Sequence, residues 1–166
     1  MNAGRGLASK GKAKNKLPIS FLRVTDGAGA VIAPEWLPRA ESVHRQLRDA
    51  LPPGFEAWHQ ILQNVFANGG RMTLAVEGEM VRGVAVWHIF ETPGGRHLFV
   101  DDLVTDAACR SQGIGRGLIG WLESEARAHY CAMLSLTSNV KRNEAHRFYF
   151  REGFFIASYY FRKNLG

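Results

Sequence analysis

The sequence predicts a mixed α+β fold in which a central, mostly antiparallel sheet is flanked by helices. Three observations lead to this prediction. Residues 71–105 have the pattern of three consecutive strands joined by short turns, which is typical of an antiparallel run. A glycine-rich stretch, residues 110–117, then separates the last of these strands from a helix-like segment. A further apolar strand follows that helix, and a strand–helix–strand connection of this kind adds a parallel neighbour to the sheet.

The composition is that of a globular protein with one domain. Of the 166 residues, 46% are hydrophobic and 22% are charged. No apolar run approaches the roughly 20 residues of a membrane span, and the first residues lack the apolar core of a signal peptide. Cys109 and Cys131 do not make a disulfide framework, so we expect a cytoplasmic protein.

Much of the net charge of +6 comes from the first seventeen residues. This stretch is rich in Gly, Ala, Ser and Asn, which is typical of a flexible chain. We therefore predict a flexible basic tail over residues 1–17 and a single domain over residues 18–166. A basic tail can touch nucleic acid, but we interpret this one as solvated and expect neither a nucleic-acid nor a membrane partner.

The first half of the domain is predicted to contain one strand and two helices. Val43 and Leu47 are four residues apart, a helical spacing, and Pro52-Pro53-Gly54 breaks the helix that holds them. The predicted elements are a strand at 18–24, a helix at 34–51 and a helix at 55–67.

The second half is predicted to hold the hairpins and the crossover. Glu77-Gly78-Glu79 has the chemistry of a hairpin turn, Asn143 is a candidate N-cap, and Gly153 is a candidate C′ residue. The predicted elements are strands at 71–76, 81–90 and 98–105, a helix at 114–129, a strand at 131–136, a helix between Asn143 and Gly153, and one or more strands at 154–163.

The most informative segment is the glycine loop, Arg110-Ser111-Gln112-Gly113-Ile114-Gly115-Arg116-Gly117. Glycines lack a Cβ atom, so an anionic group can approach the backbone of such a turn closely. The following helix adds unpaired N–H donors and a partial positive charge. The loop therefore predicts a cradle for the phosphates of a nucleotide-containing cofactor. Gly117 and Gly120, inside the helix, are expected to let it approach the sheet.

Two other phosphate-binding loops fit poorly. A P-loop needs Gly-Lys followed by Ser or Thr, and no such triplet follows these glycines. A dinucleotide-binding loop of the Rossmann type needs a third glycine where Leu118 stands. It also needs an acidic residue about 20 positions further on, and residues 131–139 contain none.

The loop and its flanks resemble the GNAT superfamily of acyl-CoA-dependent N-acetyltransferases. The family signature is Gln or Arg, then x-x-Gly-x, then Gly or Ala, between a strand and a helix, and Arg110-x-x-Gly113-x-Gly115 matches it. The resemblance runs from about Arg71 to about Phe161, while the first seventy residues match only loosely. The other matching segments are 99–104 before the loop, 135–137 and 143–149 after it, and 152–154 at the end of the last helix.

The resemblance implies transfer of the acetyl group of acetyl-CoA to a primary amine of a small molecule or peptide, by direct attack in a ternary complex and without a metal. Asp101 stands where many relatives carry a Glu base, and its shorter side chain suggests action through a water. Strand alternation predicts that Asp101 and Asp102 lie on opposite faces, so that only one points at the acyl group. Tyr149 matches the general acid of the family, because a phenol with a pKa of about 10 can protonate a thiolate.

The resemblance also implies the residues that hold the co-substrate. In the family the strand before the loop splays from its neighbour, which frees the Val104 N–H for the thioester carbonyl and the strand edge for the pantetheine arm. The predicted binding residues are Leu103, Val104 and Thr105 on the strand, Arg110, Gln112, Gly113, Ile114, Gly115, Arg116 and Gly117 in the loop, and Asn143 against the pantetheine.

One alternative function remains open at this point: a non-catalytic acyl-CoA sensor on the same fold. It would keep the glycine loop but tolerate loss of the base and the acid, so the presence of both Asp101 and Tyr149 favours the enzyme. The six histidines show no metal-ligand spacing, and we favour packing roles for His88 and His97 over places beside the acceptor cleft. The open edges of the predicted sheet are compatible with a homodimer.

Overall fold

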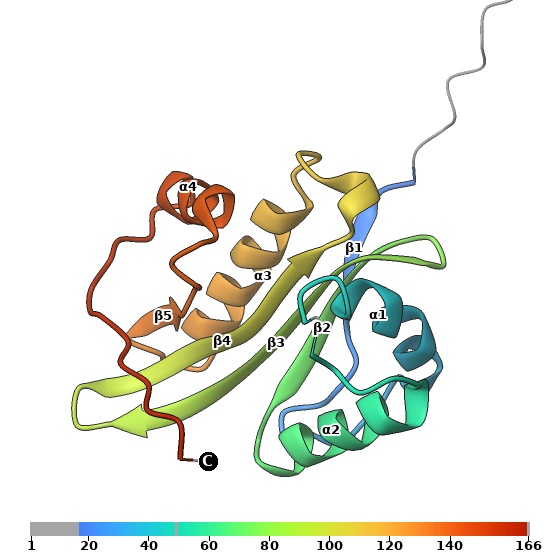
Figure 1. Cartoon of the computed structure of the whole chain (residues 1–166), viewed down its shortest axis with the longest axis horizontal. Helices are drawn as coiled ribbons and strands as arrows, with labels where there is room; N and C mark the ends of the chain where they lie inside the picture. The colour runs from blue at the N-terminus through green and yellow to red at the C-terminus, as the bar shows by residue number, and fades with distance from the viewer. Residues whose placement is uncertain (1–16, 49, 166) are drawn as a thin grey trace, which may run out of the picture.

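The computed structural model describes residues 17–48 and 50–165 and shows a five-stranded sheet with helices on both faces (Figure 1). Neighbours in the chain are neighbours in the sheet, and β5 alone runs parallel to its partner, β4. The predicted α+β fold is confirmed. The strands are β1 (Ile19–Arg23), β2 (Arg71–Glu77), β3 (Met80–Thr92), β4 (Gly95–Thr105) and β5 (Met133–Leu136).

The helices divide between the two faces of the sheet. In Figure 1, α1 and α2 cover one face, α3 covers the other, and α4 lies beside α3. The helices are α1 (Leu37–His44), α2 (Phe55–Ala67), α3 (Ile114–Ala128) and α4 (Asn143–Arg151), with short 3₁₀ turns η1 (Pro34–Trp36) and η2 (Ala107–Cys109).

The first helix is shorter than predicted. Instead of running to residue 51, α1 ends at His44, and the chain continues in tighter turns in which Leu47 N–H bonds His44 O and Arg48 N–H bonds Arg45 O. Both His44, the last residue of α1, and Arg48, in the turns that follow, contact Asp102 of β4.

Each face of the sheet has its own hydrophobic core. Trp58, Met72 and Val84 belong to the cluster beneath α1 and α2, while Trp87 and Leu118 belong to the cluster beneath α3. Strand residues alternate between these two clusters, as expected for a sheet covered on both sides.

Glycines bring α3 close to the sheet. A Cβ atom at Gly117 would lie 2.6 Å from Cζ of Phe21 on β1, so the close approach predicted there is confirmed. At Gly120 an added Cβ would meet nothing within 4 Å, so the same prediction is wrong for that residue.

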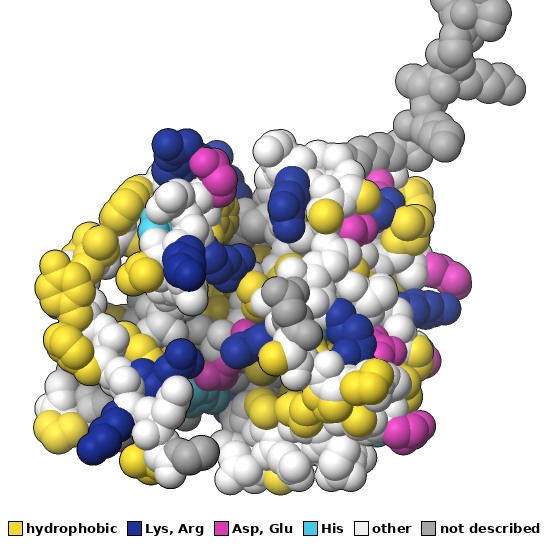
Figure 2. Space-filling model, in the orientation of Figure 1, with side chains coloured by type: hydrophobic (Ala, Val, Ile, Leu, Met, Phe, Trp, Pro, Cys, Tyr) yellow, Lys and Arg dark blue, Asp and Glu magenta, His cyan; other side chains and the backbone are white. Residues whose placement is uncertain are grey.

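The end of the chain departs from the prediction. Gly153 ends α4 with a φ of +86°, as its C′ role requires, but the described residues 154–165 form no strand where one was predicted at 154–163. The aromatic and β-branched residues there favour a strand, yet no strand of the described chain pairs with them. They are exposed instead, and Figure 2 shows the resulting hydrophobic band along the left edge. They are Phe155, Ile156, Tyr159, Tyr160 and Phe161.

The predicted basic tail, residues 1–17, lies outside the described residues except for Leu17, which is exposed. Across residues 17–48 and 50–165, no helix combines the length and the apolar character needed to cross a membrane.

Candidate functional site

Asp101 and Asp102 lie on the same face of the sheet because β4 carries a bulge. Val86 of β3 pairs with Asp102 and the next residue, Trp87, pairs with Val100, so Asp101 is the extra residue. The bulge interrupts the alternation of side chains. The prediction that the two acids lie on opposite faces is therefore wrong, and both line one cavity.

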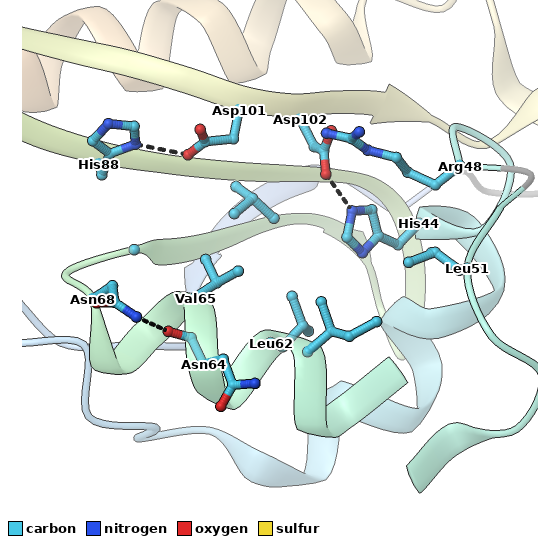
Figure 3. A pocket seen from close by; sticks show the side chains of 13 residues that line it. His44, Arg48, Leu51, Leu62, Asn64, Val65, Asn68, His88, Asp101 and Asp102 are labelled. Carbon is cyan, nitrogen blue, oxygen red and sulfur yellow. Dashed lines mark hydrogen bonds and ion pairs between the residues drawn. The ribbon is translucent and has the colours of Figure 1, made fainter. Parts of the chain in front are cut away.

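That cavity, of about 630 Å³, lies between the sheet and the α1–α2 side of the molecule (Figure 3). Figure 3 shows His88 and Asp101 at one end, Asp102 with His44 and Arg48 at the other, and α2 side chains facing them. The remaining lining residues are mainly apolar: Leu51, Ile61, Leu62, Val65, Val86 and Gly70, with the amides Asn64 and Asn68.

At the Asp102 end, every polar group has a partner. His44 Nε2 lies 2.9 Å from Asp102 Oδ2, Arg48 Nε donates to Oδ1 at 2.8 Å, and Trp58 Nε1 donates to His44 Nδ1 at 3.0 Å. An indole N–H can only donate, so His44 Nδ1 must accept. The His44 proton is therefore on Nε2, the ring is neutral, and Asp102 accepts from it as a carboxylate.

The charge of Asp102 is held firmly. Burial by itself would raise the pKa of this carboxyl group, but the hydrogen bonds from His44 and Arg48 outweigh burial and hold its pKa below the usual value. Asp102 is thus a buried anion fixed in place, and its two partners pin the end of α1 and the turn after it to β4.

At the Asp101 end, the carboxylate is bonded to one histidine and has more access to solvent. His88 Nδ1 lies 2.8 Å from Asp101 Oδ2, and about a third of each side chain is exposed, 32% and 33%. The imidazole of His88 stacks on Phe90 with ring centroids 5.2 Å apart and tilts against Phe99 at 5.5 Å. The predicted base therefore opens into the cavity beside a histidine whose ring is held by aromatic neighbours.

The edge of β4 opens immediately after the bulge. Pairing between β4 and β5 spans His97 to Val100 on the β4 side and ends there. From Asp102 to Thr105, β4 is paired with β3 alone within the described chain. The main chain of Leu103, Val104 and Thr105 thus has no β5 neighbour. The resemblance to the GNAT superfamily implied such a separation of the two strands.

The glycine loop follows directly and lies on the surface. Arg110, Gln112 and Gly113 are exposed, and Gly113 takes a left-handed φ of +81° immediately before α3. Gln46 anchors the entry to the loop: its Oε1 accepts the Ala107 N–H at 2.8 Å and its Nε2 donates to Asp106 at 3.2 Å. The loop therefore presents its backbone and the start of α3 outward on a fixed base.

Other residues of the predicted phosphate site have packing contacts. Ile114 is buried in the core, and a Cβ at Gly115 would lie 3.1 Å from Phe148 Cζ on α4. Arg116 Nε lies 3.1 and 3.3 Å from the two carboxylate oxygens of Glu152, which ties the start of α3 to the end of α4. The lack of a side chain at Gly115 thus serves the docking of α4, and an anion has its open approach at Gly113.

Helix α4 carries the predicted acid. Tyr149 is buried, with its ring 5.4 Å from Phe148 and 5.7 Å from Phe154. Burial raises the pKa of its phenol, partly offset by the charge of Arg142. Among the described residues Tyr149 does not line the cavity that holds Asp101.

Asn143 is exposed at the first position of α4. The N-cap is Arg142, without a side-chain capping bond, so the predicted N-cap role of Asn143 is wrong. Its exposure leaves the predicted contact with a pantetheine arm sterically open.

Sequence reasoning missed the partners of both acids. His44 and Arg48 are 58 and 54 positions away from Asp102, and no spacing in the sequence indicates that pairing. His88 is only 13 positions from Asp101, and counting back from the turn at 92–95 pairs His88 with Phe99, two residues before Asp101. The bulge, which no local pattern indicates, completes that contact. Among the described residues no three His, Cys, Asp or Glu side chains could hold a metal ion together.

Comparison with known proteins assigns the family. The model of the Acetyltransferase (GNAT) family matches residues 36–154. An uncharacterized N-acetyltransferase, YhdJ, of Bacillus subtilis (strain 168) is 47% identical over 70 residues, which are 42% of this chain and 49% of that protein. The aminoalkylphosphonate N-acetyltransferase of Salmonella typhimurium is 41% identical over 66 residues, 40% of this chain and 43% of that protein. The matches thus span about half the length of these curated relatives, or less.

The fold is similar to that of solved acetyltransferases. The crystallised aminoglycoside N-acetyltransferase AAC(6')-Iy in complex with CoA superposes with a TM-score of 0.72 at 14% identity, covering 95% of this chain and 99% of that one. At this identity the likeness concerns the fold alone. Together with the family match over residues 36–154, it leads to one conclusion: this chain belongs to the acetyltransferase (GNAT) family.

Proposed function

We propose that the protein is an acetyl-CoA-dependent N-acetyltransferase that acts on a primary amine of a small molecule or peptide by direct attack in a ternary complex. One observation carries the proposal. The bulge in β4 turns Asp101 into a cavity, and the same strand then opens its edge and leads into the exposed glycine loop. A base and a thioester held along one strand would meet at the bulge.

The acetyl donor, acetyl-CoA, would bind along the part of the chain that follows the bulge. We propose that the open edge at Leu103, Val104 and Thr105 pairs with the pantetheine arm, as an added strand would. The exposed Gln112 and Gly113, with the N-terminus of α3, suit a diphosphate. The other proposed contacts are Arg110, Ile114, Gly115, Arg116, Gly117 and Asn143. That CoA binds the related aminoglycoside acetyltransferase supports this choice of donor.

Three groups of the chain would carry the reaction. Asp101 supplies the negative charge of the general base that takes a proton from the amine. The Val104 N–H donates to the carbonyl oxygen as negative charge develops there. Tyr149 protonates the departing sulfur, and the raised pKa of its buried phenol keeps it protonated and able to donate at neutral pH. Acetyl-CoA supplies the acetyl group as a thioester.

The cavity suggests what kind of amine is accepted. Arg48 matches the charge of Asp102, and the His44 ring is neutral, so Asp101 is the carboxylate left to attract an ammonium group. Leu62 and Val65 line the wall opposite with apolar surface. We therefore propose a small amine with a single ammonium group and an apolar body. The name of the Salmonella typhimurium relative, which acts on aminoalkylphosphonates, supports a small-molecule acceptor.

Thiol release from acetyl-CoA, measured across a panel of monoamines, polyamines and peptides, tests this function, with acetyl-CoA affinity measured calorimetrically on the same protein. We expect amine-dependent release that is fastest with apolar monoamines. Tight acetyl-CoA binding without turnover of any amine would instead support the non-catalytic sensor. Absence of acetyl-CoA binding by the folded protein would contradict both.

The proposed acid has a matched control. Tyr149→Phe should lower turnover by about 10- to 100-fold while leaving acetyl-CoA affinity nearly intact. Tyr130→Phe removes a phenol of the same chemistry that is 88% exposed and should change neither quantity. Equal turnover in both variants would remove Tyr149 from the mechanism.

We also propose a homodimer that covers the exposed C-terminal band with a second copy. Burying four aromatic side chains would remove on the order of 600 Å² from water per copy, close to the about 800 Å² per partner of a standard interface. The band contains Phe155, Tyr159, Tyr160 and Phe161, all at least 74% exposed. Sedimentation should show a dimer for the wild type and a monomer for the double variant Tyr160→Ser, Phe161→Ser. A wild-type monomer at all concentrations would contradict this arrangement.

A cytoplasmic location completes the proposal. Cys109 and Cys131 are both free thiols, as is usual in a reducing compartment. Fractionation of cells that express the full chain checks it, and recovery outside the cytoplasmic fraction would contradict it.

A further inference from the structure

We propose that the acceptor amine gives its proton to Nε2 of His88, with Asp101 holding that ring from its other nitrogen, so that no water is needed between Asp101 and the amine. This inference rests on the transferase function proposed above and specifies how its base works. It reverses the packing role that the sequence suggested for His88.

The hydrogen bond between the two residues sets the tautomer. Asp101 Oδ2 lies 2.8 Å from His88 Nδ1, and an ionised carboxylate can only accept. His88 Nδ1 must therefore carry a proton, and in the neutral ring Nε2 keeps its lone pair. Among the described residues no hydrogen-bond partner occupies Nε2. The stacked Phe90 and tilted Phe99 restrict rotation of the ring.

His44, the other histidine of the cavity, has the opposite arrangement of hydrogen bonds. Its Nδ1 accepts from Trp58 and its Nε2 donates to Asp102. To take a proton His44 would have to break the bond from a fully buried indole. Each acid is thus bonded to one histidine, but only His88 has a lone pair available for a substrate.

An imidazole is also the better matched base. A general base works best when its pKa lies near the working pH. An ordinary imidazole titrates at about 6.5 and an ordinary aspartate at about 3.9. A carboxylate behind the ring stabilises the imidazolium that forms and keeps the correct nitrogen free, as in other His–carboxylate pairs.

The ammonium group first gives one proton to His88 Nε2, and the lone pair that this frees bonds to the carbonyl carbon. The carbon–sulfur bond then breaks with its electron pair moving to sulfur, which takes the Tyr149 proton. The second proton on nitrogen is lost through solvent to the Tyr149 phenolate, and His88 returns its proton to solvent. The products are an N-acetylated amine, the free thiol of CoA and one proton.

The surroundings of His88 contain few other charges. The polar residues that line the cavity on the α2 side are neutral amides, Asn64 of α2 and Asn68 immediately after it. On the other side of Phe90 lies His97, whose ring centroid is 5.4 Å from that of Phe90. Asp101 is therefore the charged group bonded to the ring. The remaining titratable or charged groups of the cavity are Asp102, Arg48 and His44 at its far end.

The kinetic test compares His88→Gln, Asp101→Asn and the control His97→Gln in the full chain. The pH dependence of kcat/KM is recorded with two amines of different pKa, because a limb that belongs to the substrate moves with the amine. In the wild type we expect an ascending limb that lies at the same pH for both amines. His88→Gln should lose that limb and lower kcat/KM by about 10²- to 10⁴-fold. Asp101→Asn should keep the limb but move it to lower pH, and His97→Gln should leave it unchanged.

Retention of the limb in His88→Gln, or a limb near the range of a carboxylic acid, would overturn the inference and leave Asp101 as the direct base. Nitrogen-15 NMR of the labelled wild-type ring gives a readout that needs no turnover: we expect the Nδ1–H tautomer at neutral pH and its loss in Asp101→Asn. An Nε2–H tautomer in the wild type would contradict the inference. Failure of the transferase function itself would look different, as acetyl-CoA binding without turnover of any amine by the wild type.

Discussion

The two ends of the cavity place the same two residue types, an aspartate and a histidine, in opposite situations. At one end Asp102 is buried, and its two carboxylate oxygens are bonded to His44 and Arg48 rather than available to a substrate. At the other end Asp101 is a third exposed, and its one histidine keeps a nitrogen free. Two residues that are adjacent in sequence thus have different roles: we assign Asp102 to structural support and Asp101 to the proposed general base.

The largest effect should come from Asp101→Asn. Without the carboxylate, the His88 ring loses the bond that fixes its tautomer, and we expect kcat/KM to fall by about 10²- to 10⁴-fold. Stability should change little, because the side chain is partly solvated. Steady-state kinetics and urea unfolding on the same preparation check both statements. Full activity of Asp101→Asn would contradict the proposed difference between the roles of Asp101 and Asp102.

Asp102→Asn should show the reverse pattern. The amide cannot accept from both His44 and Arg48 as a carboxylate does, so we expect a loss of about 2 kcal/mol in the free energy of unfolding. Any fall in turnover at low temperature, where the variant is folded, should be far smaller than for Asp101→Asn. Unchanged stability in urea would show that the buried network does not hold α1 to β4.

The stabilising contribution of Asp102 should depend on pH. Its pKa is lower in the folded than in the unfolded chain, so folding favours the ionised form. The contribution is therefore complete above the unfolded pKa, about 3.9, and is lost as the pH falls through the folded value. The stability difference between wild type and Asp102→Asn should be constant near neutrality and shrink below about pH 4. A difference that persists unchanged in acid would refute this origin.

The smallest effect is expected for Arg48→Met. The side chain of Arg48 is 53% exposed, and an ion pair that reaches solvent contributes little, so the loss should be at most about 1 kcal/mol. His44 still donates to Asp102 in this variant. High salt should reduce the wild-type stability by a similar amount, and a larger loss would mean that Arg48 also shapes the turn after α1.

The sequence was informative wherever a local pattern determines the structure. The places of the five strands β1 to β5, the limits of α2 and the glycine loop before α3 follow from periodicity and from glycine chemistry, and the structure has them near where they were expected. The family resemblance then supplied Asp101 as a candidate.

What the sequence could not give depends on long-range geometry. The single extra residue at Asp101 reverses which face of the sheet each later side chain of β4 points to. A bulge of this kind leaves no signature in the amino-acid composition. The bond from Trp58 to His44 joins two helices across a buried core, so the role of each histidine emerges only once the tautomers can be assigned. The strand predicted at 154–163 is wrong for a related reason: aromatic and β-branched residues favour a strand, but a strand also needs a neighbouring strand to pair with.

A double-mutant cycle on kcat/KM with Asp101→Asn and His88→Gln tests the central claim most directly. If the two residues act as one proton-accepting unit, the double variant should be no more than a few-fold worse than the weaker single variant, because removing either partner already disables the unit. If the two losses multiply in the double variant, Asp101 and His88 act independently, and the account of this end of the cavity is wrong.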